Sequence, residues 1–144
     1  MSEKVFVSAC LCGIRCRYNG KKLEKRKLPV SPENMVLVCP EVLAGMKIPR
    51  TPSFFDNDKT GEGVWKGETK VVSEEGEDRT EHLKKGALKA LEIATKYGIK
   101  KAYLKEKSPS CGVNLVYVGS EKVMGKGVTA SLFEQNGIEV IGVD

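Results

Sequence analysis

The sequence predicts an α/β protein: a single three-layer domain with a small, mainly parallel sheet flanked by helices. Three observations lead to this fold class. Short apolar runs rich in β-branched residues alternate with stretches of helical periodicity. The chain has 144 residues, the size of one ordinary domain. No internal repeat, low-complexity tract or linker divides it, so we expect one domain over residues 1–144.

The N-terminal part predicts two strands and a short helix. Residues 5–9 (VFVSA) and 35–39 (MVLVC) are typical of strands buried on both faces of a parallel sheet. Pro40 and Glu41 suit a first helical turn, because proline is tolerated there and an acidic group complements the positive end of the helix dipole. We expect this helix to end at Gly45.

A long loop and a more regular C-terminal part follow. Residues 46–77 hold prolines, glycines and aspartates around ETKVV, which predicts a loop with one hairpin or edge strand. Leucines and alanines at helical spacing then predict a helix over 79–97, with Asp78 and Glu81 as a capping box. The remaining expected elements are a strand at 100–106, a short strand at 114–119, a loop at 120–127, a helix at 128–137 and a strand at 138–143.

The cysteines carry the chemistry of this sequence. They are Cys10, Cys12, Cys16, Cys39 and Cys111. A domain of this length does not need disulfides to fold, and clustered thiols in a reducing compartment are more often metal ligands or catalytic groups. Cys10, Cys39 and Cys111 each lie at or shortly after the end of a predicted strand. Because parallel strands end at one edge of their sheet, where such folds bind ligands, we expect these three thiols to meet.

Three converging thiols fit zinc with a fourth ligand, an iron-sulfur cluster or a redox pair. The paired knuckles of zinc sites are absent, and His82, the only histidine, lies on a predicted helix. Spacing leaves Cys12 or Cys16 open as a fourth ligand, so all three kinds of site remain. We interpret Cys12 as a small buried side chain. Cys16 is a bystander or a redox thiol, because the neighbouring arginines would lower its pKa.

The charge pattern bears on partners and location. The net charge is +5, from 24 Lys and Arg against 19 Asp and Glu, and the excess lies in residues 15–27. Tyr18 is the only aromatic residue in this run. Because charged runs without interleaved aromatic residues are usually solvated surface, we favour a solvated connection over a nucleic-acid site. No stretch approaches the roughly 20 apolar residues that span a bilayer, and the first ten residues do not resemble a secretory leader. We therefore expect a cytoplasmic protein without a membrane partner.

Five motifs follow one another along nearly the whole chain. They are SACLCGIRCRYNG at 8–20, CPE at 39–41, IPR at 48–50, KSPSCG at 107–112 and GKGVTASLF at 125–133. With them the sequence resembles the thiouracil desulfidase family. The resemblance implies a small α/β domain that binds a [4Fe-4S] cluster through three cysteines and removes sulfur, as sulfide, from a thiolated pyrimidine such as 2-thiouracil, without net redox change. Ser53 and Phe54 depart from the acidic PR-x-P-x-E form of many relatives, which bears on the substrate.

The resemblance assigns Cys10, Cys39 and Cys111 as the cluster ligands, in agreement with the strand-end argument. Three thiolates leave one iron without a protein ligand, and such an iron can act as a Lewis acid on a soft thiocarbonyl sulfur. Glu41, two residues after Cys39, is the expected general acid/base, with a helix-start role as the alternative. Ser108 is expected to orient water or relay a proton, or else to cap its loop.

Four further residues are expected to bind substrate. Arg50 and Lys107 would hold the pyrimidine carbonyl or a phosphate. Ser110 and Gly112 complete the set, and Gly112 has no Cβ to keep the backbone away from the cluster. The partner is a small thiolated pyrimidine, and we expect a monomer. The alternatives are a thiol-redox enzyme that works without iron and a zinc-stabilised nucleic-acid binding module.

Overall fold

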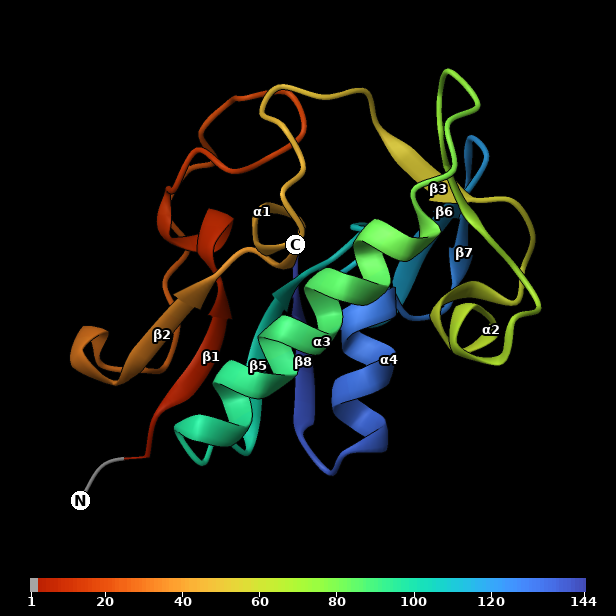
Figure 1. Cartoon of the computed structure of the whole chain (residues 1–144). Coiled ribbons are helices and arrows are strands. Elements are labelled where there is room, and N and C mark those ends of the chain that lie inside the picture. Colours follow the sequence, from red (N-terminus) through yellow and green to blue (C-terminus); the bar gives the residue numbers. More distant parts are fainter. Residues whose placement is uncertain (1–2) are drawn as a thin grey trace.

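Two four-stranded sheets organise the chain in the computed structural model, which describes residues 3–144 (Figure 1). The strands are β1 (Val5–Ser8), β2 (Met35–Val38), β3 (Ser53–Phe55), β4 (Val71–Ser73), β5 (Lys101–Lys105), β6 (Leu115–Val118), β7 (Glu121–Met124) and β8 (Glu139–Val143). The helices are α1 (Pro40–Leu43), α2 (Thr60–Lys66), α3 (Thr80–Lys96) and α4 (Val128–Gln135), with two 3₁₀ helices, η1 (Ala9–Cys12) and η2 (Pro32–Asn34). No helix within residues 3–144 is long and apolar enough to cross a membrane.

The first sheet has the order β2-β1-β5-β8, and every neighbouring pair is parallel. Its four strands confirm the predictions at residues 5–9, 35–39, 100–106 and 138–143. The chain leaves β1 for β2 on one side and reaches β5 and β8 on the other. The C-terminal ends of β2, β1 and β5 are therefore neighbours at a topological switch point, which is the ligand-binding position of open α/β sheets.

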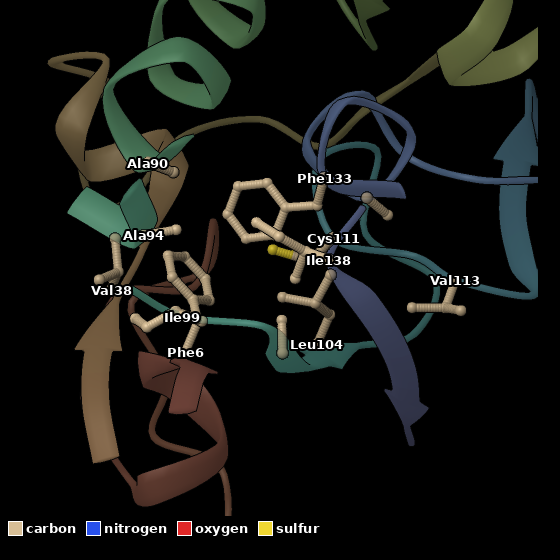
Figure 2. Close-up of a cluster of buried hydrophobic side chains, with 12 residues drawn as sticks. Phe6, Val38, Ala90, Ala94, Ile99, Leu104, Cys111, Val113, Phe133 and Ile138 are labelled. Atoms are coloured by element: carbon tan, nitrogen blue, oxygen red, sulfur yellow. The ribbon is translucent and has the colours of Figure 1, made fainter. Parts of the chain in front are cut away.

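Different structures cover the two faces of this sheet. α3 and α4 lie on one face, where the rings of Phe6 and Phe133 meet edge to face with centroids 4.8 Å apart (Figures 1 and 2). Val7 points the opposite way, as alternation along a strand requires, and packs with Leu11 and Leu28. The third layer is thus built by η1 and the loop after it, while the predicted helices 79–97 and 128–137 are confirmed as α3 and α4.

A second sheet corrects the expectation of long loops. Its order is β4-β3-β6-β7, with antiparallel pairs β3–β4 and β6–β7 and a parallel pair β3–β6. Residues 46–77 were expected to be mainly loop, but they contain β3, α2 and β4, and the expected loop 120–127 contains β7. The helix α2 was not predicted because it contains two glycines, which disfavour helices. Gly61 is required by packing, because a Cβ there would collide with the backbone of Gly127.

Candidate active site

A cavity of about 660 Å³ opens at the C-terminal edge of the first sheet, and residues of both sheets form its wall. This volume is within the range of small-molecule sites. Seven of the residues expected to form the site line the cavity, namely Cys10, Cys39, Glu41, Arg50, Lys107, Ser108 and Cys111. Ser110 and Gly112 are not part of the lining.

The three predicted ligand cysteines reach the cavity from neighbouring strands. Cys10 lies in η1 directly after β1, Cys39 follows the last residue of β2, and Cys111 lies in the loop after β5. Figure 2 shows the Cys111 side chain beside Phe133 and Ile138 in the core between the first sheet and its helices. The convergence expected from strand topology is therefore present in the fold.

A fourth cysteine, Cys16, also reaches this cavity. Its thiol is hydrogen-bonded to the side chains of Cys10 and Cys39, and the four residues Ala9, Cys10, Cys16 and Cys39 pack in one group with Leu23. Cys12 lies elsewhere: its sulfur is 3.8 Å from that of Met35, in the layer built by η1. Cys12 was interpreted as a small buried side chain, but it is only partly buried. The position of Cys16 was not foreseen from the sequence.

The surroundings raise the pKa values of these thiols. The hydrogen bond with Cys10 is the main cause that raises the pKa of Cys16, to about 11, and burial raises that of Cys111 to about 12. The hydrogen bond with Cys16 and burial also raise the pKa of Cys39. The expected lowering of the Cys16 pKa by neighbouring arginines is thus wrong, because the hydrogen bond with Cys10 and burial raise this pKa and no arginine is among its causes. A metal cation bound here would favour the thiolate forms over the neutral thiols.

The three predicted ligand cysteines supply sulfur donors to the cavity, and their spacing decides which metal group they fit. Within the part of the chain that the structure describes, no group of three or more His, Cys, Asp or Glu side chains is arranged to hold one metal ion. An iron-sulfur cluster is larger than a single ion, so its ligands stand apart around it, and thiolates are its usual ligands. Cys10, Cys39 and Cys111, from three strand ends around one cavity, fit this requirement.

Glu41 and Arg50 form an ion pair in the cavity wall. Pro40 begins α1 and places Glu41 in its first turn, where Oε2 lies 3.1 Å from Nη2 of Arg50. Arg50 also donates hydrogen bonds to the carbonyl oxygens of Lys47, at 3.0 Å, and Cys16, at 3.4 Å. Arg50 was expected to hold substrate, and its guanidinium is engaged by Glu41 and by two carbonyl oxygens. These contacts orient Glu41 and fix the backbone beside Cys16.

The loop that carries Cys111 is held by its own side chains. The Ser108 hydroxyl accepts hydrogen bonds from the backbone N–H groups of Ser110, at 3.1 Å, and Cys111, at 3.0 Å. The Ser110 hydroxyl is fully buried and lies 2.7 Å from that of Thr129. A Cβ on Gly112 would approach a backbone oxygen to 2.6 Å. Ser110 and Gly112 therefore shape the loop from behind, whereas Ser108 both caps it and faces the cavity.

The cavity-lining lysines are paired with an acid near the end of β8. Nζ of Lys107 lies 3.0 and 3.1 Å from the two carboxylate oxygens of Asp144, and Nζ of Lys105 lies 3.5 Å from one of them. The contact with Lys107 is the main cause that lowers the pKa of Asp144, and the contact with Lys105 lowers it further. Arg26, from the basic run 15–27, donates to the Asp144 carbonyl at 2.7 Å. Part of this run is thus engaged within the fold.

Comparison with known proteins places this chain in a family. The model of the 2-thiouracil desulfurase family matches residues 5–144. The chain belongs to this family. It is 42% identical over 142 residues to the uncharacterized protein YbbK of Bacillus subtilis strain 168, covering 95% of this chain and 93% of YbbK. A solved structure of a [4Fe-4S]-dependent thiouracil desulfidase, TudS, is similar with a TM-score of 0.81 and 34% identity, over 98% of this chain and 91% of that one. The predicted fold class and family resemblance are confirmed.

Glu106 is a residue of this family member that sequence reasoning missed. Its carboxylate accepts hydrogen bonds from the backbone of Val113, at 2.8 Å, and from the backbone and side chain of Asn114, at 2.9 and 2.7 Å. Burial alone would raise the pKa of Glu106, but these bonds outweigh it and lower the pKa. A Cβ on Gly142 would collide with this carboxylate. The available signal was an acidic residue at the end of a buried strand, directly before KSPSCG.

The aromatic part of the cavity wall was also missed. Tyr18, Phe54 and Tyr117 bring aromatic rings to the cavity, the last two from the second sheet. Arg79, at the start of α3, donates hydrogen bonds at 2.8 Å to the hydroxyls of Ser53 and Thr51 and so holds this wall in place. No sequence pattern placed these residues together, because the second sheet itself was not predicted.

Proposed function

We propose that this chain, acting as one domain over residues 1–144, is a [4Fe-4S]-dependent desulfidase for a thiolated pyrimidine such as 2-thiouracil. One observation carries the proposal: Cys10, Cys39 and Cys111, from three neighbouring strand ends, share a cavity with Glu41. Membership of the 2-thiouracil desulfurase family and the likeness to TudS support it.

The proposed reaction exchanges sulfur for oxygen at an unchanged oxidation level. One C=S group and one water become one C=O group and hydrogen sulfide, so no electrons are supplied or removed. A cluster held by the three cysteines would supply an iron without a protein ligand, a Lewis acid suited to soft sulfur. The protein must then place a water beside the thiocarbonyl carbon and move its protons.

Glu41 is the proposed general base for that water. It lines the cavity from the first turn of α1, and its short separation from Cys39 keeps it close to the ligand set. The guanidinium of Arg50 holds one carboxylate oxygen at 3.1 Å and leaves the other for the water. Arg50 is therefore proposed as the positioning residue for Glu41. The hydroxyl of Ser108 accepts two backbone bonds, so its own proton is available to water or substrate.

The rest of the cavity is proposed to hold the pyrimidine. The flat faces of Phe54 and Tyr117 suit a planar ring, and aromatic stacking on a base contributes about 1–3 kcal/mol. Lys107 also lines the cavity, although its ammonium group is paired with the Asp144 carboxylate. Ser110 and Gly112 act indirectly, through the shape of the loop that carries Cys111.

Metal analysis followed by a sulfide assay tests the proposal. Anaerobically purified protein should be brown and contain iron and acid-labile sulfide, and it should release sulfide from 2-thiouracil with stoichiometric formation of uracil. A colourless protein that contains zinc would favour the nucleic-acid binding module instead. A colourless metal-free protein with dithiol activity would favour the thiol-redox enzyme. Either result, after reconstitution with iron and sulfide has also failed, overturns the proposal.

A further inference from the structure

Cys16 has no task in the proposed reaction, yet its side chain forms part of the cavity wall. Only 5% of the residue is exposed, and it packs in one group with Cys10 and Cys39. The Cys39 sulfur also lies 3.9 Å from the Cys16 carbonyl oxygen, and Arg50 donates to the same oxygen. A thiol held in contact with two expected ligands has a chemistry of its own when those ligands carry no metal.

We propose that Cys16 is a resolving thiol, which forms a disulfide with Cys39 when the cysteine site carries no metal group. The oxidant is a small-molecule disulfide. The Cys39 thiolate attacks one sulfur of this molecule, which gives a mixed disulfide and releases the first small thiol. The Cys16 thiolate then attacks the Cys39 sulfur and displaces the second small thiol. Two protein thiols are oxidised and one small disulfide is reduced, so atoms and electrons balance.

The exposure of the cysteines assigns the two roles. Cys39 is partly exposed in the cavity wall, whereas Cys10, Cys16 and Cys111 are buried, so an oxidant that enters the cavity meets Cys39 first. Cys16 then lies within reach of the modified sulfur, because the two residues pack in one group and the Cys39 sulfur lies 3.9 Å from the Cys16 carbonyl oxygen. Cys12 is excluded by its place beside Met35 in another layer.

The consequence concerns survival of the site after its metal group is lost. A partly exposed thiol without a partner can be oxidised further to sulfinic acid, which thiols do not reverse, whereas a disulfide returns to two thiols on reduction. The disulfide with Cys16 thus protects Cys39 from irreversible oxidation until a metal group binds to the site again. This role is separate from the proposed desulfidation and does not depend on it.

Thiol mapping of metal-free protein tests the pairing. Chelator-treated, fully reduced wild type is incubated with oxidised glutathione, denatured under acid, alkylated and analysed by peptide mass spectrometry. We expect wild type to lose two free thiols, carry no stable glutathione and yield one crosslinked peptide pair, Cys16 with Cys39. Cys16→Ser should instead accumulate glutathione on Cys39. Cys12→Ser, the matched control, should behave as wild type.

Three results would overturn the inference: five alkylatable thiols in treated wild type, a crosslink that pairs Cys10 with either partner, or no glutathione on Cys39 in Cys16→Ser. Circular dichroism checks the fold of that variant, and Cys16→Ala replaces it if serine unfolds the loop. A second measurement exposes metal-free protein to peroxide, then reduces it and counts recovered thiols. Wild type and Cys12→Ser should recover Cys39, and Cys16→Ser should lose it. Neither readout needs a cluster or turnover, so failure of the desulfidase proposal would leave this result intact.

Discussion

Nη2 of Arg50 lies 3.1 Å from Oε2 of Glu41, and the two side chains are only 5% and 16% exposed. They come from separate segments, the first turn of α1 and the stretch before β3, so their contact depends on the tertiary fold. Removing one partner of a buried pair typically costs about 3–5 kcal/mol, because the other charge is left unpaired. The pair therefore fixes where the Glu41 carboxylate stands relative to the cysteines.

Glu41→Gln preserves the shape of the side chain and removes its ability to take a proton. We expect kcat for sulfide release to fall by about 10²- to 10⁴-fold, roughly 3–5 kcal/mol of transition-state stabilisation, with little change in KM. Visible spectra and iron content should match wild type. Turnover within about tenfold of wild type would assign the proton work to Ser108 or bulk water and leave Glu41 a helix-start role.

Arg50→Lys keeps the charge but not the planar fork that reaches Glu41 and two carbonyl oxygens. We expect kcat to fall by about 10- to 100-fold through misplacement of Glu41. In a Glu41→Gln background the same change should add less than about threefold, because the two residues act on one step. Fully additive losses in this double-mutant cycle would show that Arg50 acts on substrate directly.

Single serine substitutions of Cys10, Cys39 and Cys111 should each abolish cluster incorporation, because serine replaces a soft thiolate ligand. Cys12→Ser and Cys16→Ser should retain most of the iron and labile sulfide. The measurement is iron and sulfide per chain after anaerobic reconstitution. The ligand assignment is wrong if Cys16→Ser loses the cluster while Cys10→Ser keeps it.

Turnover should need no external reductant once the cluster is intact, because replacement of sulfur by oxygen from water leaves the oxidation level unchanged. Sulfide release should proceed at the same rate with and without dithionite, measured anaerobically on one reconstituted preparation. Consumption of one equivalent of reduced carrier per sulfide would contradict this and indicate a redox reaction.

The hydrogen bonds to the Glu106 carboxylate should make the free energy of unfolding depend on pH in the acid range. Hydrogen bonds hold the pKa of Glu106 below its ordinary value, so its contribution to stability is present above about pH 4.3 and is lost as pH falls through the lower folded pKa. Glu106→Gln should destabilise the fold at neutral pH by about 1–3 kcal/mol, because donors to the carboxylate are left without acceptors.

Thermal unfolding from neutral to acid pH measures this effect. The difference in Tm between wild type and Glu106→Gln should shrink below the pKa. Gly142→Ala should reproduce the neutral-pH loss by displacing the carboxylate. A constant difference in Tm at all pH values would mean that packing around Glu106, rather than its charge, is what stabilises the loop.

The sequence predicted the parts of this protein whose signals are local. Buried apolar runs identified the four strands of the first sheet, and their shared direction predicted that Cys10, Cys39 and Cys111 would meet. The helix α2 escaped because Gly61 and Gly63 serve close packing, and glycine weakens every local helix signal. β7 escaped because it is short, begins with two charged residues and is mostly exposed, and only backbone pairing with β6 makes it a strand.

Functional residues that depend on long-range contacts were less visible. Cys16 reaches the other thiols because the loop after η1 turns back, and no periodicity records such a turn. The partner of Glu41 was equally hidden: Arg50 was recognised as functional, but its place beside that carboxylate comes from tertiary packing. Glu106 binds a segment seven to nine residues further on, across the loop that carries Cys111.

The cavity wall is divided between the two sheets. All of the cysteines that line it come from the first sheet and its loops, whereas Ser53, Phe54 and Tyr117 belong to the second. We therefore expect side-chain changes at Phe54 or Tyr117 to alter which molecule is accepted while the cysteines stay in place. The departure of Ser53 and Phe54 from the acidic form of many relatives falls on that second wall. In this chain, selectivity can thus be changed in one half of the fold while the half that holds the thiols is left unaltered.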